Sequence, residues 1–253
     1  MTLPAGRARE KREALRVPLR IMLALSLAAL ALSAGLRRRL PPPGLVDGSL
    51  LADPIQSAEE VAPPFEVVRK GVLYMVTPAF GYEIRGLVVS EHDSRAFTDL
   101  SHERWKDNLN VKDVCVVWGR NVATGVYRKM KFRNRDFTCY YYYPDSATGA
   151  LFTENCLSNN HLLAGDNSMA RKVRMVRRGD QIHVRGWLVS YERPGTPFRR
   201  GTSTTREDRG NGACETVYVT EFEVLRPGNP GWRRLFGLSV VGAAASVLAL
   251  FLL

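Results

Sequence analysis

Arginine and hydroxyl side chains crowd residues 193–213, a segment between two stretches that resemble strands. It is longer than a hairpin turn, and connections of such length in compact domains are usually either functional or disordered. Guanidinium groups with neighbouring hydroxyl donors can hold a phosphate, sulfate or carboxylate. We therefore predict an anion- or partner-binding loop, the alternative being a mobile solvated connection. Its candidate ligand-binding residues are Arg199, Arg200, Thr202, Ser203, Thr205, Arg206 and Asp208.

Hydrolytic chemistry is a second interpretation of the same segment, with Arg206 and Asp208 acting beside His102 or His161. A general base needs a group to deprotonate within hydrogen-bond reach. His161 stands in a polar stretch typical of a turn, so a hydrogen-bonded turn histidine is the simpler interpretation. A Cys–His pair with Cys214 has suitable residue types, but no elbow motif surrounds the cysteine. No catalytic residue is assigned.

Imidazole and carboxylate groups also gather in one short segment: His92, Asp93, Asp99, His102 and Glu103. Such ligands suit zinc or manganese. The spacing is not His-Glu-x-x-His, and acids that alternate with basic residues are typical of a solvated helix face. We therefore expect no metal site here and no cofactor.

Four cysteines lie in the middle of the chain: Cys115, Cys139, Cys156 and Cys214. In an exported domain an even number permits two disulfides with three connectivities. Cys139 and Cys156 bracket a turn-rich stretch, so we predict that they pair. The alternative is a set of free thiols in a cytosolic domain.

A run of four tyrosines, residues 140–143, follows a group of basic side chains: Lys129, Lys131, Arg133 and Arg135. Aromatic rings beside basic residues are typical of nucleic-acid surfaces, whereas a strand with its rings in the core would look the same. The net charge is +11, but the excess lies beside two apolar segments, and the region between them is nearly neutral. We therefore do not expect a nucleic-acid partner.

The two apolar segments are residues 21–36 and 235–253, close to the roughly 20 residues that span a bilayer. We predict two transmembrane helices and the lipid bilayer as a partner. For the first, a cleaved signal peptide is the alternative, but three arginines follow it directly. In the second, Gly242 and Ser246 are small residues four apart, which favours helix pairing and a homo-oligomer.

Two spans place both termini on one side of the membrane. A short basic tail, residues 1–20, resists translocation, whereas a whole domain can cross largely regardless of its charge. We therefore predict cytoplasmic termini and an extracytoplasmic domain. Proline-rich residues 37–64 are expected to form a spacer before the folded domain, residues 65–226.

The folded region is predicted to be mainly β with one or two short helices. The better helix lies near 167–178, capped by Asn167 or Ser168, and a weaker one covers about 94–109. The predicted strands are 82–90, 113–119, 137–143, 180–191 and 215–225.

A short internal repeat indicates how these strands are arranged. The sequence Arg-Gly-Leu-Val-Val-Ser at 85–90 recurs as Arg-Gly-Trp-Leu-Val-Ser at 185–190. A glycine inside a strand marks a bulge, a bend or a close backbone approach, which small barrels require. The order β-β-β-α-β-β is that of an OB-type barrel, in which the first and fourth strands are neighbours. We predict a small closed barrel with OB-like order, flanked by two transmembrane helices; a β-sandwich or another small barrel is the alternative.

The expected function is binding or scaffolding by a membrane-anchored module. Its loop, residues 193–213, would recognise a partner protein, an envelope polymer or an anionic ligand. A membrane-anchored hydrolase and a cytoplasmic-side nucleic-acid-binding module are the alternatives. An enzyme is the less favoured class.

Overall fold

A computed structural model describes residues 5–59, 61–135, 137–208 and 213–253 of the chain. They divide into two compact units. The first joins the segment up to Arg39 with the segment from Asn229 to Leu253, and the second is Leu40–Gly228.

The first unit is a pair of helices, α1 (Ala5–Leu36) and α6 (Pro230–Leu252). Both are long and apolar enough to cross a membrane. The basic residues predicted as a tail continue α1 back to Ala5. A Cβ atom on Gly242 would lie 2.7 Å from Ser26 Oγ of α1, and Ser246 is fully buried. The small residues of α6 are therefore used within the chain, and pairing of two copies stays a prediction.

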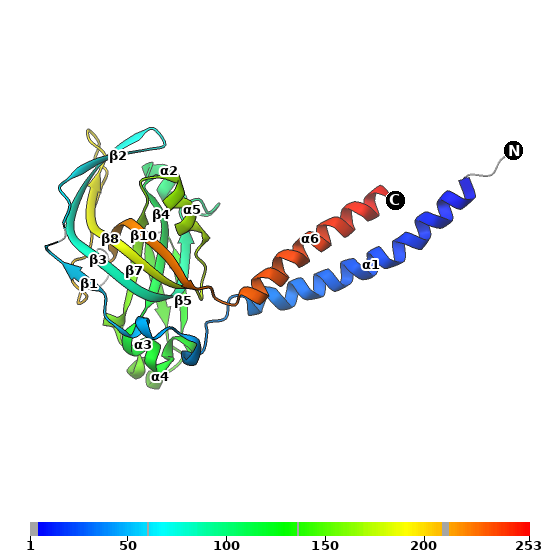
Figure 1. The fold of residues 1–253 in the computed structure, drawn as a ribbon, viewed down its shortest axis with the longest axis horizontal. Helices are drawn as coiled ribbons and strands as arrows, with labels where there is room; N and C mark the ends of the chain where they lie inside the picture. Colours follow the sequence, from blue (N-terminus) through cyan, green and yellow to red (C-terminus); the bar gives the residue numbers. More distant parts are fainter. Residues whose placement is uncertain (1–4, 60, 136, 209–212) are drawn as a thin grey trace. The chain divides into compact units, whose positions relative to one another are not determined.

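The second unit contains an eight-stranded sheet that is organised around one long strand, β3 (Figure 1). β3 pairs with β4, β4 with β7, β7 with β10, β10 with β8, and β8 returns to pair with β3. The β7–β10 pair is parallel, and the other four pairs are antiparallel. The bounds are β3 (Val72–Asp93), β4 (Asn110–Val117), β7 (Leu157–Leu163), β8 (Gln181–Glu192) and β10 (Glu215–Arg226).

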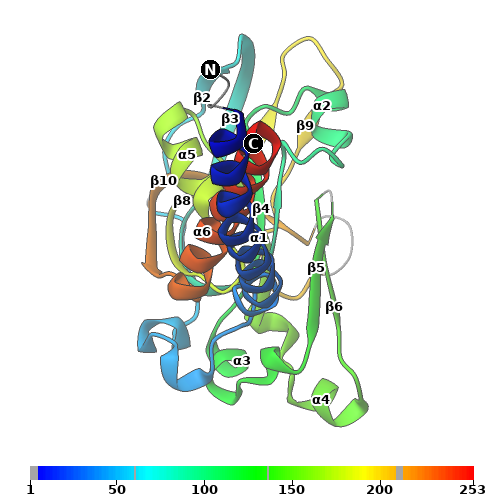
Figure 2. The ribbon, with the colours of Figure 1, turned by 90° about the vertical axis from the view of Figure 1, so that its right-hand side faces the viewer.

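Shorter elements surround this cycle of five strands. β1 (Ile55–Ser57) and β2 (Phe65–Arg69) pair with β3, and β9 (Arg199–Arg200) pairs with β8. β5 (Lys131–Arg135) and β6 (Thr138–Tyr142) form a separate hairpin (Figure 2). The short helices are α2 (Ser101–Trp105), α3 (Gly119–Thr124), α4 (Ser146–Leu151) and α5 (Asn167–Met175), with 3-10 turns η1 (Pro43–Leu45), η2 (Gly48–Leu51), η3 (Val126–Arg128) and η4 (Glu154–Cys156).

The two strands that carry the internal repeat are neighbours, as predicted, since Tyr82 of β3 is opposite Gly186 of β8. A Cβ atom on Gly186 would lie 2.0 Å from the backbone oxygen of Tyr218, next to a register shift in β10. On Gly86 a Cβ atom would lie 3.1 Å from Val116 Cβ. Both glycines therefore mark close approaches between strands.

Three element predictions are wrong in detail. The strand between β4 and α5 in the five-strand cycle is β7, not the predicted 137–143, which belongs to the β5–β6 hairpin. The weaker helix is only the five-residue α2, which ends at Lys106 in the left-handed region (φ 50°). α5 lies where the better helix was expected, but Asp166 caps it by accepting hydrogen bonds from the backbone N–H groups of Ser168 and Met169.

The predicted spacer also needs correction, because most of it belongs to the folded unit. Leu50 is fully buried and packs with Leu40 in the same apolar cluster. The side chain of Gln181 donates to the backbone oxygen of Leu45 (2.9 Å) and accepts from the backbone N–H of Asp47 (2.7 Å). Apolar burial and these hydrogen bonds hold the segment against the sheet.

The disulfide joins Cys115 to Cys139, so the predicted Cys139–Cys156 pair is wrong. Cys139 lies in the β5–β6 hairpin, which brings it within 5.9 Å (Cα–Cα) of Cys115 in β4, a separation typical of disulfides. Cys156 and Cys214 are free thiols.

A buried charge ties α5 to the sheet. Lys112 of β4 is fully buried, and its ammonium donates to the backbone oxygen of Val176 (2.7 Å) at the end of α5. The same ammonium forms an ion pair with Glu91 at 2.8 Å. Val173 of α5 packs among the main apolar cluster, which includes Ile84 of β3.

Candidate functional site

The loop between β8 and β10 lines a cavity of about 930 Å³. Of the predicted ligand-binding residues, Ser203 does not line the cavity, since it is buried and its hydroxyl donates to the backbone oxygen of Thr205 (2.7 Å). The other predicted residues line it: Arg199, Arg200, Thr202, Thr205, Arg206 and Asp208. The loop prediction therefore identified side chains that share one cavity.

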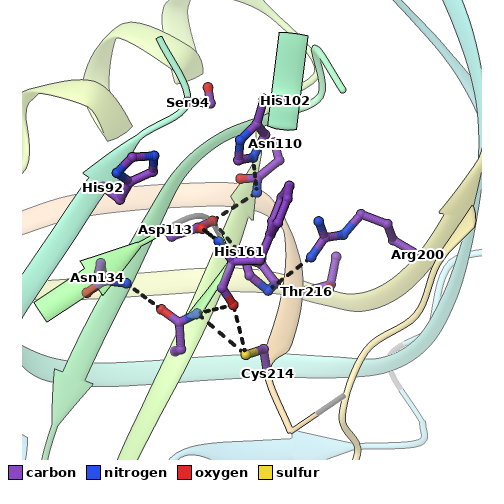
Figure 3. Close-up of polar contacts among 12 residues, drawn as sticks. His92, Ser94, His102, Asn110, Asp113, Asn134, His161, Arg200, Cys214 and Thr216 are labelled. Atoms are coloured by element: carbon purple, nitrogen blue, oxygen red, sulfur yellow. Dashed lines mark hydrogen bonds and ion pairs between the residues drawn. The ribbon is translucent and has the colours of Figure 1, made fainter. Parts of the chain in front are cut away.

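His161 and Asp113 form the buried centre of this site (Figure 3). They face each other on neighbouring strands, His161 on β7 and Asp113 on β4, and His161 Nδ1 lies 2.7 Å from Asp113 Oδ1. Asn110 donates to the same carboxylate oxygen (2.9 Å), and the backbone N–H of Phe137 donates to the other (3.0 Å). His161 is thus a buried strand residue, and its interpretation as a turn histidine is wrong.

Each partner of this pair shifts the other's protonation. Burial alone would lower the pKa of His161, but the charge and hydrogen bond of Asp113, with a contribution from the Cys214 side chain, raise it to about 9. Burial alone would raise the pKa of Asp113, but the charge and hydrogen bond of His161 lower it to about 2. At neutral pH the pair is therefore an imidazolium and a carboxylate.

Arg200 extends from β9 toward Nε2 of this imidazole. Its Nη2 lies 3.3 Å from His161 Nε2, and its guanidinium carbon lies 3.7 Å from the centre of the Phe137 ring. Phe137 has a positive φ of 61° and also stacks on Trp105, with ring centres 5.2 Å apart. The Phe137 ring therefore makes a cation–π contact with the Arg200 guanidinium, and this guanidinium lies directly beside the His161 imidazolium.

Cys214 and Glu215 complete the site at the start of β10. The Cys214 thiol is half-buried, interacts with the His161 ring, and accepts a hydrogen bond from the Asn159 amide at 3.5 Å. Glu215 is only 6 % exposed, and its Oε2 has no hydrogen-bond partner among the described residues. Burial chiefly, with the nearby Asp208 charge, raises the pKa of Glu215 to about 8.

A chain of polar contacts continues from Asp113 away from the cavity. Asn110 Nδ2 lies 3.0 Å from His102 Nε2, and His102 Nδ1 lies 2.6 Å from Asp99 Oδ2. His92 Nε2 contacts the same oxygen of Asp99 at 2.7 Å. Asp99 and His102 are each 4 % exposed, so the predicted solvated helix face is wrong for them. In the described part of the chain, no group of three or more His, Cys, Asp or Glu side chains could hold a metal ion.

The second candidate surface is the β5–β6 hairpin. Its exposed face carries cross-strand pairs of a basic residue and a tyrosine, Lys131 opposite Tyr142 and Arg133 opposite Tyr140. Tyr141 points the other way and packs with the core, where its hydroxyl donates to Glu154 (2.7 Å). The tyrosine run is therefore both a core strand face and an exposed aromatic face.

Asp113, Asn110, Phe137 and Glu215 are site residues that were not predicted. Asp113 and Glu215 begin predicted strands, but nothing in either strand's pattern distinguishes a buried carboxylate from a boundary residue. Pairing between β4 and β7 places Asp113 opposite His161. This pairing was not predicted, because the polar sequence of β7 is typical of a turn.

No protein-family model matches the chain, and neither the curated proteins nor the solved structures give a match.

Proposed function

We propose that this protein is a membrane-anchored binding module whose second unit holds an anionic ligand in the cavity beside His161. The observation that carries this proposal is the 3.3 Å approach of Arg200 Nη2 to His161 Nε2. Two cationic groups so close repel each other, and an anion that bridges them would offset that repulsion.

The charges of the cavity wall support an anionic ligand. Arg199, Arg200, Arg206 and the His161 imidazolium are cationic at neutral pH. Glu215 also lines the cavity, but with a pKa of about 8 it is mostly neutral there. Thr202 and Thr205 add hydroxyl groups. The remaining acids of the wall, Glu154 and Asp208, do not balance these cations.

The fold that carries this site is, in the same proposal, a small closed barrel with OB-like order. The support is the cycle of pairings β3–β4–β7–β10–β8–β3. In addition, α5 lies between β7 and β8 along the chain, where an OB barrel has its helix. The cavity would then be formed in part by the loop between the fourth and fifth barrel strands, a common ligand-binding position in OB folds.

The proposed anchors are α1 and α6, which would leave both termini in the cytoplasm and the second unit outside it. A disulfide in that unit supports this orientation, because disulfides persist in oxidising compartments. An envelope polymer or a partner protein with an anionic group is the corresponding ligand class. A reporter fused at residue 150 should be active only on the extracytoplasmic side, and cytoplasmic activity would refute this topology.

The binding proposal is tested with sulfate, whose charge is constant between pH 6 and 10. Purified full-length protein in detergent micelles is heated in sodium sulfate and in sodium chloride at matched ionic strength. Sulfate should raise the midpoint of unfolding more than chloride does, and the difference should shrink above pH 9 as His161 loses its proton.

Two variants separate site binding from general salting effects. Arg200→Gln should abolish the sulfate-specific increase, whereas Arg171→Gln, which removes the same charge from an exposed position on α5, should retain it. An equal response of both variants to sulfate would refute the binding proposal.

The hydrolase remains a second candidate because Arg206, Asp208 and His161 line the same cavity, while His102 does not line it. The nucleic-acid alternative would use the exposed face of the β5–β6 hairpin. Neither needs the close Arg200–His161 contact.

A further inference from the structure

Cys214 occupies an environment in which thiols react. It is half-buried in the wall of the cavity and interacts with the His161 side chain, which in turn lies next to the Arg200 guanidinium. Reactive cysteines are found in such electropositive, partly accessible places. His161 is in turn oriented by Asp113, whose Oδ1 lies 2.7 Å from His161 Nδ1. The three side chains therefore have the order nucleophile, imidazolium acid and orienting carboxylate.

Glu215 gives an independent indication that a ligand belongs here. Its side chain is more than nine-tenths buried, lines the same cavity, and leaves Oε2 without a partner among the described residues. A buried polar atom without a partner is costly unless a ligand or water completes it. A carboxyl that keeps its proton can donate to a carbonyl oxygen of such a ligand.

We propose that Cys214 is the nucleophile of an acyl-transfer site, with His161 as its acid–base partner, Asp113 as a positioning residue, and an anionic ester or thioester as substrate. This inference rests on the proposed anion binding. Phosphoryl transfer is less consistent with the site, because Cys214 precedes a strand and not a helix N-terminus whose N–H groups could hold a phosphoryl group.

Water is the second reactant, so the overall reaction is hydrolysis of the ester or thioester. The Cys214 thiolate attacks the carbonyl carbon, a carbon–sulfur bond forms, and the bond to the leaving oxygen or sulfur breaks. The Nε2 proton of His161 passes to the leaving group, and Arg200 stabilises the transient oxyanion. Water then attacks the thioester, neutral His161 accepts its proton, and Cys214 leaves as thiolate. The products are a carboxylic acid and an alcohol or thiol.

The test uses 4-acetoxybenzoate and its neutral methyl ester as acetyl donors to the full-length protein in detergent micelles. Acetylation of Cys214 and of Cys156 is followed by mass spectrometry of acid-quenched peptides. Cys156 is the internal control because it is also a half-buried free thiol. With the carboxylate ester, Cys214 should react about 100-fold faster than Cys156, the scale of acid–base assistance. The ratio should fall with the methyl ester.

Equal rates for the two cysteines would overturn the proposal, and so would an equal ratio for the two esters. Cys214→Ser should stop the release of 4-hydroxybenzoate. Asp113→Asn should slow acetylation of Cys214 alone and change its pH dependence. If that variant does not fold, the pH profile of the wild-type Cys214:Cys156 ratio still decides, because a ratio independent of pH across 6–10 refutes a role for His161.

The two proposals fail in distinguishable ways. If sulfate binds through Arg200 but Cys214 is no faster than Cys156, only the thiol chemistry is wrong. If sulfate does not bind, and Cys214 reacts equally well with both esters, the anion site itself is wrong.

Discussion

Replacing Glu215 by glutamine should stabilise the protein at alkaline pH. In the folded chain the pKa of Glu215 is about 8, against 4.5 for an ordinary glutamate, chiefly because the carboxylate is desolvated. Folding therefore favours the protonated form. Below pH 4.5 both states hold the proton, so there is no penalty. As pH rises from 4.5 to 8 the unfolded chain ionises first, and stability falls.

The size of this loss follows from the shift. One pKa unit corresponds to about 1.4 kcal/mol, so the full penalty above pH 8 is at most about 5 kcal/mol. Glutamine cannot ionise and avoids it. For a domain of this size 1 kcal/mol moves the midpoint of thermal unfolding by about 2–4 °C. The variant should therefore exceed wild type by about 10 °C at pH 9 and match it near pH 4.5.

The assay is thermal unfolding of the full chain in detergent micelles, followed by tryptophan fluorescence, from pH 4.5 to 9. Glu207→Gln removes a charge from an exposed position of the same loop and should follow wild type at every pH. His161 loses its proton in an overlapping range, so only the difference between Glu215→Gln and wild type is interpreted. A difference that does not grow with pH would refute the argument.

Three further substitutions test the fold. Gly186→Ala places a Cβ atom 2.0 Å from a backbone oxygen and should lower the unfolding midpoint by at least about 10 °C, whereas Gly201→Ala, which meets nothing within 4 Å, should have little effect. Cys139→Ser opens a disulfide that spans 24 residues and should cost about 3 kcal/mol in denaturant unfolding, while Cys156→Ser should leave unfolding unchanged. Lys112→Met keeps the volume but leaves the half-buried Glu91 carboxylate without its ammonium partner and removes one of the two donors to the Val176 carbonyl, so we expect a loss of about 2–4 kcal/mol by the same measurement.

Strand pairs that bury one apolar face were predictable from the sequence. Alternating apolar residues identified most of β8 and β10, and the repeated Arg-Gly pattern identified two strands that pair. Each of the two glycines allows a close approach to a different neighbour, Gly86 to β4 and Gly186 to β10. The long loop was recognised from its length and composition, and six of its seven predicted residues share one cavity.

The buried polar strand was not predictable in the same way. The segment Leu-Ser-Asn-Asn-His-Leu-Leu of β7 looks like a turn because its polar residues suggest solvent, yet nearly all of it is buried. Its side chains are satisfied across strands, for example by Asp113 for His161 and by Asn134 for Asn159. Such partners are far apart in sequence, so the local pattern of polar and apolar residues does not predict these hydrogen bonds. The disulfide was mispredicted for the same reason.

The 22-residue strand β3 also determines when the protein can finish folding during its synthesis. β3 can pair with β2 and β4 soon after it is made, because hairpins form within about 10 μs. Its longest partner, β8, follows about 100 residues later, which at roughly 5–20 residues per second is a delay of about 5–20 s. Throughout that interval one edge of β3 is open to strands of other chains. Aggregation during production should therefore depend on translation speed between β4 and β8 more than on the stability of the finished protein.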